Sequence, residues 1–157
     1  MTVWLFSTGH HMSWVFSKPE IKGSINGSGG LIPDYLLAGA NSDGVRWFAL
    51  ELKGANAKAF HKSAGRVHLS SEANKGICQL LSYIDSLARD QAYHRENKLA
   101  GMRQPTGILM IGTEDETSDL AIRDFKQAWN RENPRLQIRS YHALLRQLES
   151  KLVDFGR

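Results

Sequence analysis

One nine-residue run constrains the fold of this chain more than any other, because it is rich in strand-forming residues and bounded by turn residues. It reads Val-Arg-Trp-Phe-Ala-Leu-Glu-Leu-Lys over residues 45–53 and lies between Asp43-Gly44 and Gly54. β-Branched and aromatic residues favour an extended, pleated backbone, and glycine interrupts it. The run therefore predicts a strand.

Two charged residues near the end of this run, Glu51 and Lys53, are spaced for a functional site. Side chains alternate along a strand, so these two project from one face while Leu50 and Leu52 project into the core from the other. The same Glu-x-Lys spacing occurs elsewhere at Glu20 with Lys22, Glu96 with Lys98, and Glu149 with Lys151. Only the pair at 51 and 53 lies in an apolar, aromatic segment, so we take it as the candidate.

A third charged residue, Asp34, lies in a second apolar run over residues 31–37. Residues 39–44, Gly-Ala-Asn-Ser-Asp-Gly, have turn chemistry and join the two runs. A hairpin of the two strands would bring Asp34 beside Glu51.

Two neighbouring carboxylates repel unless a cation lies between them, and oxygen ligands suit Mg²⁺ or Mn²⁺. Lys53, on the same face, would then orient or deprotonate an attacking water and offset the charge of the phosphate. Two carboxylates, a cation and a lysine together suit phosphodiester hydrolysis. In the alternative interpretation, Asp34 only flanks a strand, while Glu51 and Lys53 form a solvated face with an ordinary cross-strand pairing.

A helix is predicted over residues 70–89, where a serine-rich opening precedes apolar residues at helical spacing. Gln79 and Tyr83 lie four residues apart on a polar stripe beside the apolar one, which places Gln79 where it could contact a phosphate or a metal-bound water. Cys78 falls beside the apolar stripe, so we expect a buried, inert thiol. The predicted apolar stripe comprises Ile77, Leu80, Leu81, Ile84, Leu87 and Ala88.

The remaining elements alternate between strands and helices. A buried central strand is predicted over 108–111, a helix through Ile122, Phe125 and Trp129, a strand over 136–141 and a final helix over 144–152. The acids 114–116 and Asp119 precede the first of these helices and suit its dipole, so we interpret them as structural. This order predicts an α/β fold with a central mixed β-sheet flanked by helices.

Four segments together resemble the PD-(D/E)xK, or restriction-endonuclease-like, superfamily, and within it the nuclease domain of Shedu-type antiphage defence proteins. They are Ile32-Pro33-Asp34-Tyr35, Phe48-Ala49-Leu50-Glu51-Leu52-Lys53, Gln79-Leu80-Leu81-Ser82-Tyr83, and the strand and helix from Ile138 to Leu145. The resemblance covers roughly residues 31–152, on motifs that are specific in combination and weak singly.

The resemblance implies a Mg²⁺- or Mn²⁺-dependent DNA endonuclease that nicks or cuts double-stranded DNA in bacterial immunity. Asp34 and Glu51 would be metal ligands, Lys53 the catalytic lysine and Gln79 an accessory site residue. It also implies a homo-oligomer and a nuclease domain over residues 31–157, within one globular domain overall. Residues 1–30 depart from the family pattern and are expected to be irregular, with Glu20 a surface residue.

The charge distribution allows a polyanionic partner. The formal net charge is +4 and the isoelectric point is near 9.3, which is only mildly basic. Residues 55–70 carry Lys58, His61, Lys62, Arg66 and His68 and no acid. We expect Lys58, Lys62, Arg66 and, from the following helix, Lys75 to contact a DNA backbone. The alternative is a solvated connection whose charges do nothing specific.

Other classes of protein are disfavoured by the sequence. The six histidines and single cysteine lack zinc-site spacing, and residues 1–6 resemble neither a signal peptide nor a membrane span, so we expect a cytoplasmic protein. Two alternatives to a defence nuclease stay open. One is a repair or recombination nuclease of the same superfamily, resembling a junction resolvase, and the other is a catalytically silent DNA-binding module.

Overall fold

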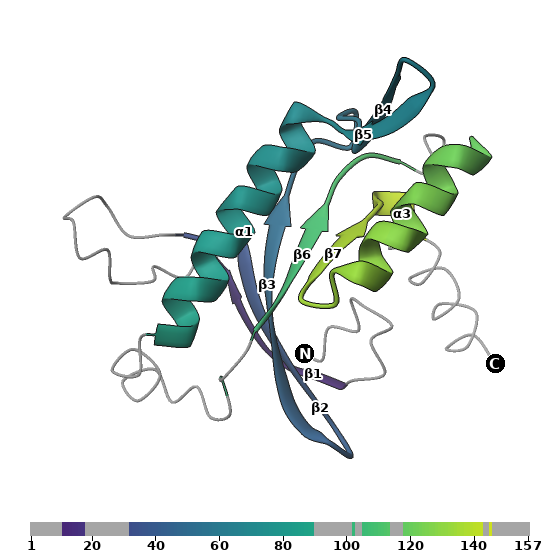
Figure 1. The fold of residues 1–157 in the computed structure, drawn as a ribbon. Helices are drawn as coiled ribbons and strands as arrows, with labels where there is room; N and C mark the ends of the chain where they lie inside the picture. Colours follow the sequence, from purple (N-terminus) through teal and green to yellow (C-terminus); the bar gives the residue numbers. More distant parts are fainter. Residues whose placement is uncertain are drawn as a thin grey trace.

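A mixed five-stranded sheet forms the centre of the computed structural model, and two helices pack on one face of it (Figure 1). The structure describes residues 11–17, 32–89, 102, 105–113, 118–142 and 145. The strand order is β1-β2-β3-β6-β7. The strands are β1 His11–Ser17, β2 Tyr35–Asn41, β3 Gly44–Leu52, β6 Thr106–Met110 and β7 Leu136–Arg139. The α/β class predicted from the sequence is confirmed.

The predicted hairpin of β2 and β3 is present and antiparallel, with Tyr35 opposite Leu50 and Asn41 opposite Gly44. Gly44 has a φ of 110°, a conformation that residues with a Cβ rarely adopt. β2 begins four residues later than residue 31, where the apolar run starts. Asp34 therefore lies just before the strand rather than inside it.

β6 lies in the middle of the parallel half of the sheet, as predicted. It pairs in parallel with β3 on one side and with β7 on the other. Ile108, Leu109 and Met110 are almost completely buried, because both sheet faces are covered at this strand.

Two segments of the chain differ from the sequence prediction. Within residues 1–30, which were expected to be irregular, β1 forms an edge strand that pairs antiparallel with β2. The basic segment after β3 is not a loop, because it contains the hairpin of β4 Phe60–Ser63 and β5 Arg66–Leu69. β1 contains a short apolar run, Trp14-Val15-Phe16, but its pairing with β2 joins separate parts of the chain and is not evident from either segment alone. The hairpin strands are short and half polar, so their signal is weak.

Helix α1 spans Ser71–Arg89 and α3 spans Leu120–Glu132, close to the predicted helices. The Asp119 side chain caps α3 by accepting from the backbone N–H groups of Ala121 and Ile122, which agrees with the structural role expected for this acid. The described part of the chain contains no helix that is long and apolar enough to cross a membrane.

Three side chains predicted to be buried are more exposed than expected. Cys78 is exposed, Leu81 has an exposed fraction of 50% and Leu52 one of 36%. The two α1 residues lie at the margin of the helix's buried face, and Leu52 is the last residue of β3. The acids 114–116 and the final helix over 144–152, except Leu145, lie outside the described residues.

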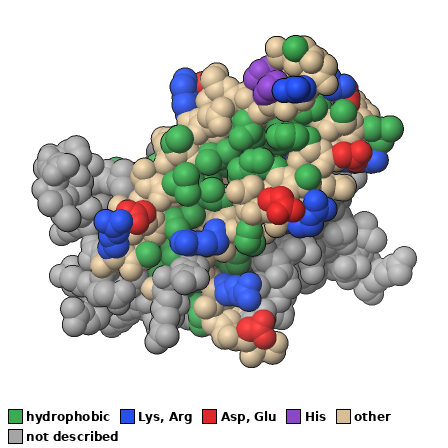
Figure 2. All heavy atoms as spheres, in the orientation of Figure 1, with side chains coloured by type: hydrophobic (Ala, Val, Ile, Leu, Met, Phe, Trp, Pro, Cys, Tyr) green, Lys and Arg blue, Asp and Glu red, His purple; other side chains and the backbone are tan. Residues whose placement is uncertain are grey.

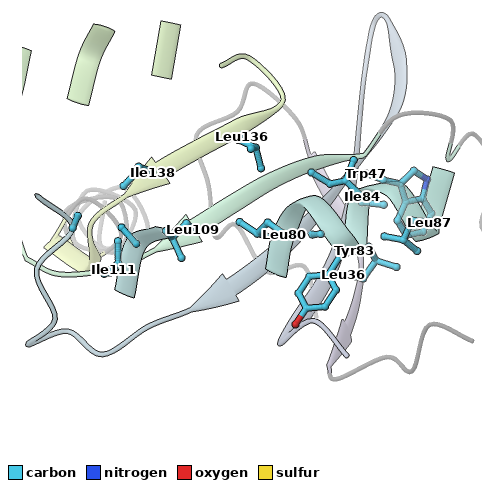
Figure 3. Close-up of a cluster of buried hydrophobic side chains, with 14 of the residues drawn as sticks. Leu36, Trp47, Leu80, Tyr83, Ile84, Leu87, Leu109, Ile111, Leu136 and Ile138 are labelled. Carbon is cyan, nitrogen blue, oxygen red and sulfur yellow. The ribbon is translucent and has the colours of Figure 1, made fainter. Parts of the chain in front are cut away.

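The main core lies between the helices and one face of the sheet (Figure 3). Leu80, Ile84 and Leu87 of α1 pack there against Trp47 of β3 and Leu109 of β6. A second cluster, centred on Phe48, Leu50 and Ile108, lies on the other face. Since odd-numbered residues of β3 face α1, the same alternation directs Glu51 and Lys53 toward that helix.

Candidate active site

The candidate site lies at the C-terminal end of β3, where the strand meets the first half of α1. Continuing the hairpin register by one residue beyond Tyr35 and Leu50 places Asp34 opposite Glu51. Asp34 Oδ2 accepts a hydrogen bond of 2.7 Å from the backbone N–H of Leu52. The hairpin thus brings the two carboxylates together, as predicted, and this bond holds the Asp34 side chain against the end of β3.

Glu51 and Lys53 form an ion pair that is largely shielded from water. Lys53 Nζ lies 2.9 Å from Glu51 Oε1, and the side chains have exposed fractions of 18% and 7%. A solvated strand face would leave both side chains exposed, so the alternative interpretation does not hold for this pair. Charges in such surroundings interact more strongly than at the surface, but they also cost desolvation energy.

Helix α1 supplies a third contact to the ammonium group. Gln79 Oε1 accepts a hydrogen bond of 2.6 Å from Lys53 Nζ. An ammonium group has three donors, so the carboxylate and the amide oxygen together use two of them. The predicted position of Gln79 over the carboxylate face is confirmed.

Tyr83 lies one helical turn after Gln79. The sequence placed it on the same polar stripe of the helix and gave it no role of its own. Its ring is buried in the core cluster (Figure 3). Its hydroxyl is hydrogen-bonded to the carboxylate of Glu51. Burial, the charge and hydrogen bond of Glu51, and the charge of Asp34 raise the pKa of Tyr83 to about 12. The hydroxyl therefore stays protonated near neutral pH and donates to the carboxylate.

A glycine allows α1 to approach the strand this closely. A Cβ placed on Gly76 would lie 2.5 Å from Leu109 Cδ1 and 3.3 Å from Lys53 Cε. The lysine side chain therefore crosses the face of α1 at the residue with no side chain. This packing sets the distance between Lys53 and Gln79.

Tyr141, just after β7, is a site residue to which sequence reasoning gave no role. Its hydroxyl donates a hydrogen bond of 2.6 Å to the backbone carbonyl of Lys53, and its own N–H donates to the carbonyl of Gly112 at 3.0 Å. Burial and the nearby charge of Asp34 raise the pKa of Tyr141. The resemblance included this residue, but its contact spans 88 positions, which no local pattern reveals.

The four predicted DNA-binding residues do not form one uniform surface. Lys58 and Arg66 are exposed. Lys62 is paired with Asp119, the N-cap of α3, and Lys75 lies 2.9 Å from Glu72 on the exposed side of α1. The positive charges of Lys62 and Lys75 are therefore partly neutralised by their own neighbours.

The donor set at the site fits a hard divalent cation. Asp34 and Glu51 are the acids at the end of β3, and among the described residues no three His, Cys, Asp or Glu side chains are grouped to hold a metal ion. Mg²⁺ is commonly held by one or two carboxylates while it keeps waters and binds phosphate oxygens. Two carboxylates at a strand end match that requirement.

A separate cavity of about 540 Å³ lies between the second half of α1 and the turn before β7, lined by residues that include Ile84, Asp85 and Arg135. It contains none of the four predicted site residues. The candidate site around Lys53 is therefore distinct from this cavity.

Comparisons with known proteins identify a family for this chain. A search of the curated proteins finds no similar sequence. The model of the family described as Shedu protein SduA, C-terminal, matches residues 2–145, which include β1 and every residue of the site. The resemblance recognised over residues 31–152 thus extends through the N-terminal segment, and the chain belongs to the family of the C-terminal domain of the Shedu protein SduA.

Proposed function

We propose that this protein is a metal-dependent DNA endonuclease that hydrolyses phosphodiester bonds of double-stranded DNA in antiphage defence. Family membership implies a nuclease domain of a Shedu defence system. The observation that carries the finer proposal is the convergence of Asp34, Glu51, Lys53 and Gln79 at one strand end. The resemblance also supports a homo-oligomer, which a mass measurement in solution tests.

Asp34 and Glu51 would hold the metal ion, Mg²⁺ or Mn²⁺. When bound, the ion would polarise a phosphate oxygen and lower the pKa of a bound water. The chain fixes both carboxylates before any ion binds. The N–H of Leu52 holds Asp34, and the hydroxyl of Tyr83 donates to Glu51. A carboxylate accepts several hydrogen bonds, so these contacts leave acceptor capacity for a cation.

Lys53 presents its ammonium group beside the carboxylates and supplies the positive charge of the site. In the structure this charge is balanced by Glu51 Oε1 and oriented by Gln79 Oε1. A phosphodiester drawn into the site would bring negative charge to the same ammonium group, which then orients the attacking water or stabilises charge on the phosphate. Gln79 acts by holding Lys53 in place while Glu51 engages the cation.

A titration with Mn²⁺ followed by calorimetry tests the assignment of metal ligands. Asp34→Ala and Glu51→Ala should weaken Mn²⁺ binding at least tenfold, since each removes one of two charged ligands. Lys53→Ala should bind Mn²⁺ as well as or better than the wild type, because the ammonium group competes with the cation for Glu51. Asp85→Asn, in an exposed ion pair at the other end of α1, is the matched control.

The same variants should then be compared in DNA cleavage. All three site variants should lose turnover, while Asp85→Asn keeps it. Equal loss of Mn²⁺ affinity in Lys53→Ala and Glu51→Ala would contradict the separate roles assigned to the lysine and the carboxylates. Cleavage by Glu51→Ala at the wild-type rate would remove this site from the reaction.

A further inference from the structure

The hairpin β4–β5 is a basic projection that none of the site chemistry uses. Its turn consists of Ala64 and Gly65, both with positive φ, at 49° and 73°. Two residues of this kind form the type I′ connection that matches the twist of paired strands. The register is therefore well defined, with Ser63 opposite Arg66 and His61 opposite His68.

One face of the hairpin packs on the protein. Phe60 is buried and meets the ring of Phe125 edge to face, with centroids 5.7 Å apart. Val67 and Leu69 are partly buried against the same core. Lys62, opposite Val67 and on this inner face, has its ammonium group paired with Asp119 of α3.

The other face is exposed and has no acid. It carries His61, His68, Ser63 and Arg66, all of which are exposed. The two imidazole rings stack at 5.5 Å with an angle of 27° between their planes. Figure 2 shows the histidines together with a basic side chain over this hairpin. Since residues 55–70 lack Asp and Glu, no acid within the hairpin neutralises this outer face.

The hairpin lies at the same end of the molecule as the candidate site. It follows β3 and precedes α1 directly, and the N–H of Ser70 donates to the carbonyl of Ala59 at 2.9 Å, which closes the hairpin base against the helix start (Figure 1). Gln79 lies eight residues into α1, or about 12 Å along its axis. The start of α1, which the base of the hairpin adjoins, is therefore separated from Gln79 by a length on the order of the major-groove width, so a duplex held at Lys53 would extend toward the hairpin.

We propose that the outer face of the hairpin, formed by His61, Ser63, Arg66 and His68, binds the phosphate backbone of DNA next to the cleavage site. Arg66 supplies a fixed positive charge and a fork of donors, and the imidazole N–H groups and the Ser63 hydroxyl add hydrogen bonds. This inference rests on the proposed function and refines its DNA contacts. It excludes Lys62, whose ammonium group is directed toward α3 on the inner face.

Fluorescence anisotropy with a labelled 30-base-pair duplex in chelator measures binding without cleavage. Arg66→Ala should weaken binding several-fold and reduce the slope of log affinity against log salt by about 1, because one phosphate contact is lost. The double variant His61→Ala/His68→Ala should also weaken binding several-fold. Lys62→Ala, on the same hairpin but the opposite face, is the matched control and should bind within twofold of the wild type.

The outcomes separate this inference from the proposed function. If the wild type binds DNA, the outer-face variants bind more weakly than Lys62→Ala, and no cleavage occurs, the result would contradict the nuclease proposal and support DNA binding by the outer face. Normal metal-dependent cleavage with unchanged binding in Arg66→Ala and the histidine double variant would overturn the surface alone. Equal losses in Lys62→Ala and Arg66→Ala would also overturn it, provided that thermal unfolding shows all variants folded.

Discussion

Replacing Gly76 with alanine tests whether the approach of α1 to β3 sets the geometry of the site. In a helix interior, alanine is favoured over glycine by about 1 kcal/mol. Against that gain, the new Cβ would lie 2.5 Å from Leu109 Cδ1 and 3.2 Å from Cδ2, and Leu109 is 1% exposed in the packed core. Overpacking of this kind costs about 1–3 kcal/mol, so we expect a net loss of roughly 0–2 kcal/mol in the free energy of unfolding.

The substitution should also lower turnover. Lys53 Cε lies 3.3 Å from the position of the new Cβ, so the lysine must shift by a few tenths of an ångström. That shift alters its 2.6 Å contact with Gln79. Misplacing a reacting group by about 1 Å can cost about a hundredfold, so we expect a loss of about tenfold in kcat.

Urea unfolding and plasmid cleavage measure the two quantities. Asn74→Ala is the control, because Asn74 is exposed on the same helix and alanine there improves helix propensity without a clash. It should be as stable as the wild type or slightly more so, with full activity. A Gly76→Ala variant that gains stability as Asn74→Ala does and cleaves at the wild-type rate would refute the idea that the close approach positions Lys53.

Three further predictions concern contacts around the site and the sheet edge. Tyr141→Phe loses the donor to the Lys53 carbonyl and should lower kcat several-fold with little change in KM; an unchanged kcat would show that this hydrogen bond does not position the lysine. Asn130→Ala loses two hydrogen bonds from α3 to the backbone of Ile138 and should lower the free energy of unfolding by about 2 kcal/mol, whereas exposed Gln127→Ala should not; denaturant titration compares them. Because the pKa of Tyr83 is raised from 10.0 to about 12, the folded state keeps a proton that the unfolded state loses, so stability should fall as pH rises from 10 to 12. Tyr83→Phe should flatten that dependence in unfolding experiments over this range, and an equally steep loss in the variant would assign it to other groups.

The elements with strong local periodicity were predictable from the sequence. β3 is rich in strand-forming residues and bounded by turn residues, β6 contains a continuous apolar run, and α1 and α3 have apolar residues at helical spacing. The position of Asp34 opposite Glu51 was predictable because two strands joined by a short turn form a hairpin. These features depend on neighbours along the chain.

The features that were missed depend on residues far apart in the chain. The role of Tyr141 at Lys53 and the pairing of Lys62 with Asp119 join positions separated by 88 and 57 residues. Each strand of the hairpin β4–β5 has only four residues and Lys62 lies on the inner face, so the strand alternation is short and interrupted, and Ala64-Gly65 is a weak turn signal. Cys78 lies beside the apolar stripe, and one helical position was enough to expose it.

The measurement that tests the central claim most directly is a nicking and linearisation assay on supercoiled plasmid, comparing the wild type with Lys53→Ala in Mg²⁺, in Mn²⁺ and in chelator. Calorimetry and thermal unfolding of the same samples establish that the variant binds metal and is folded. We expect nicked or linear product only from the wild type and only with metal. Cleavage by folded Lys53→Ala at the wild-type rate, or wild-type cleavage that persists in chelator, would contradict the proposal that Asp34, Glu51 and Lys53 form a metal-dependent nuclease site.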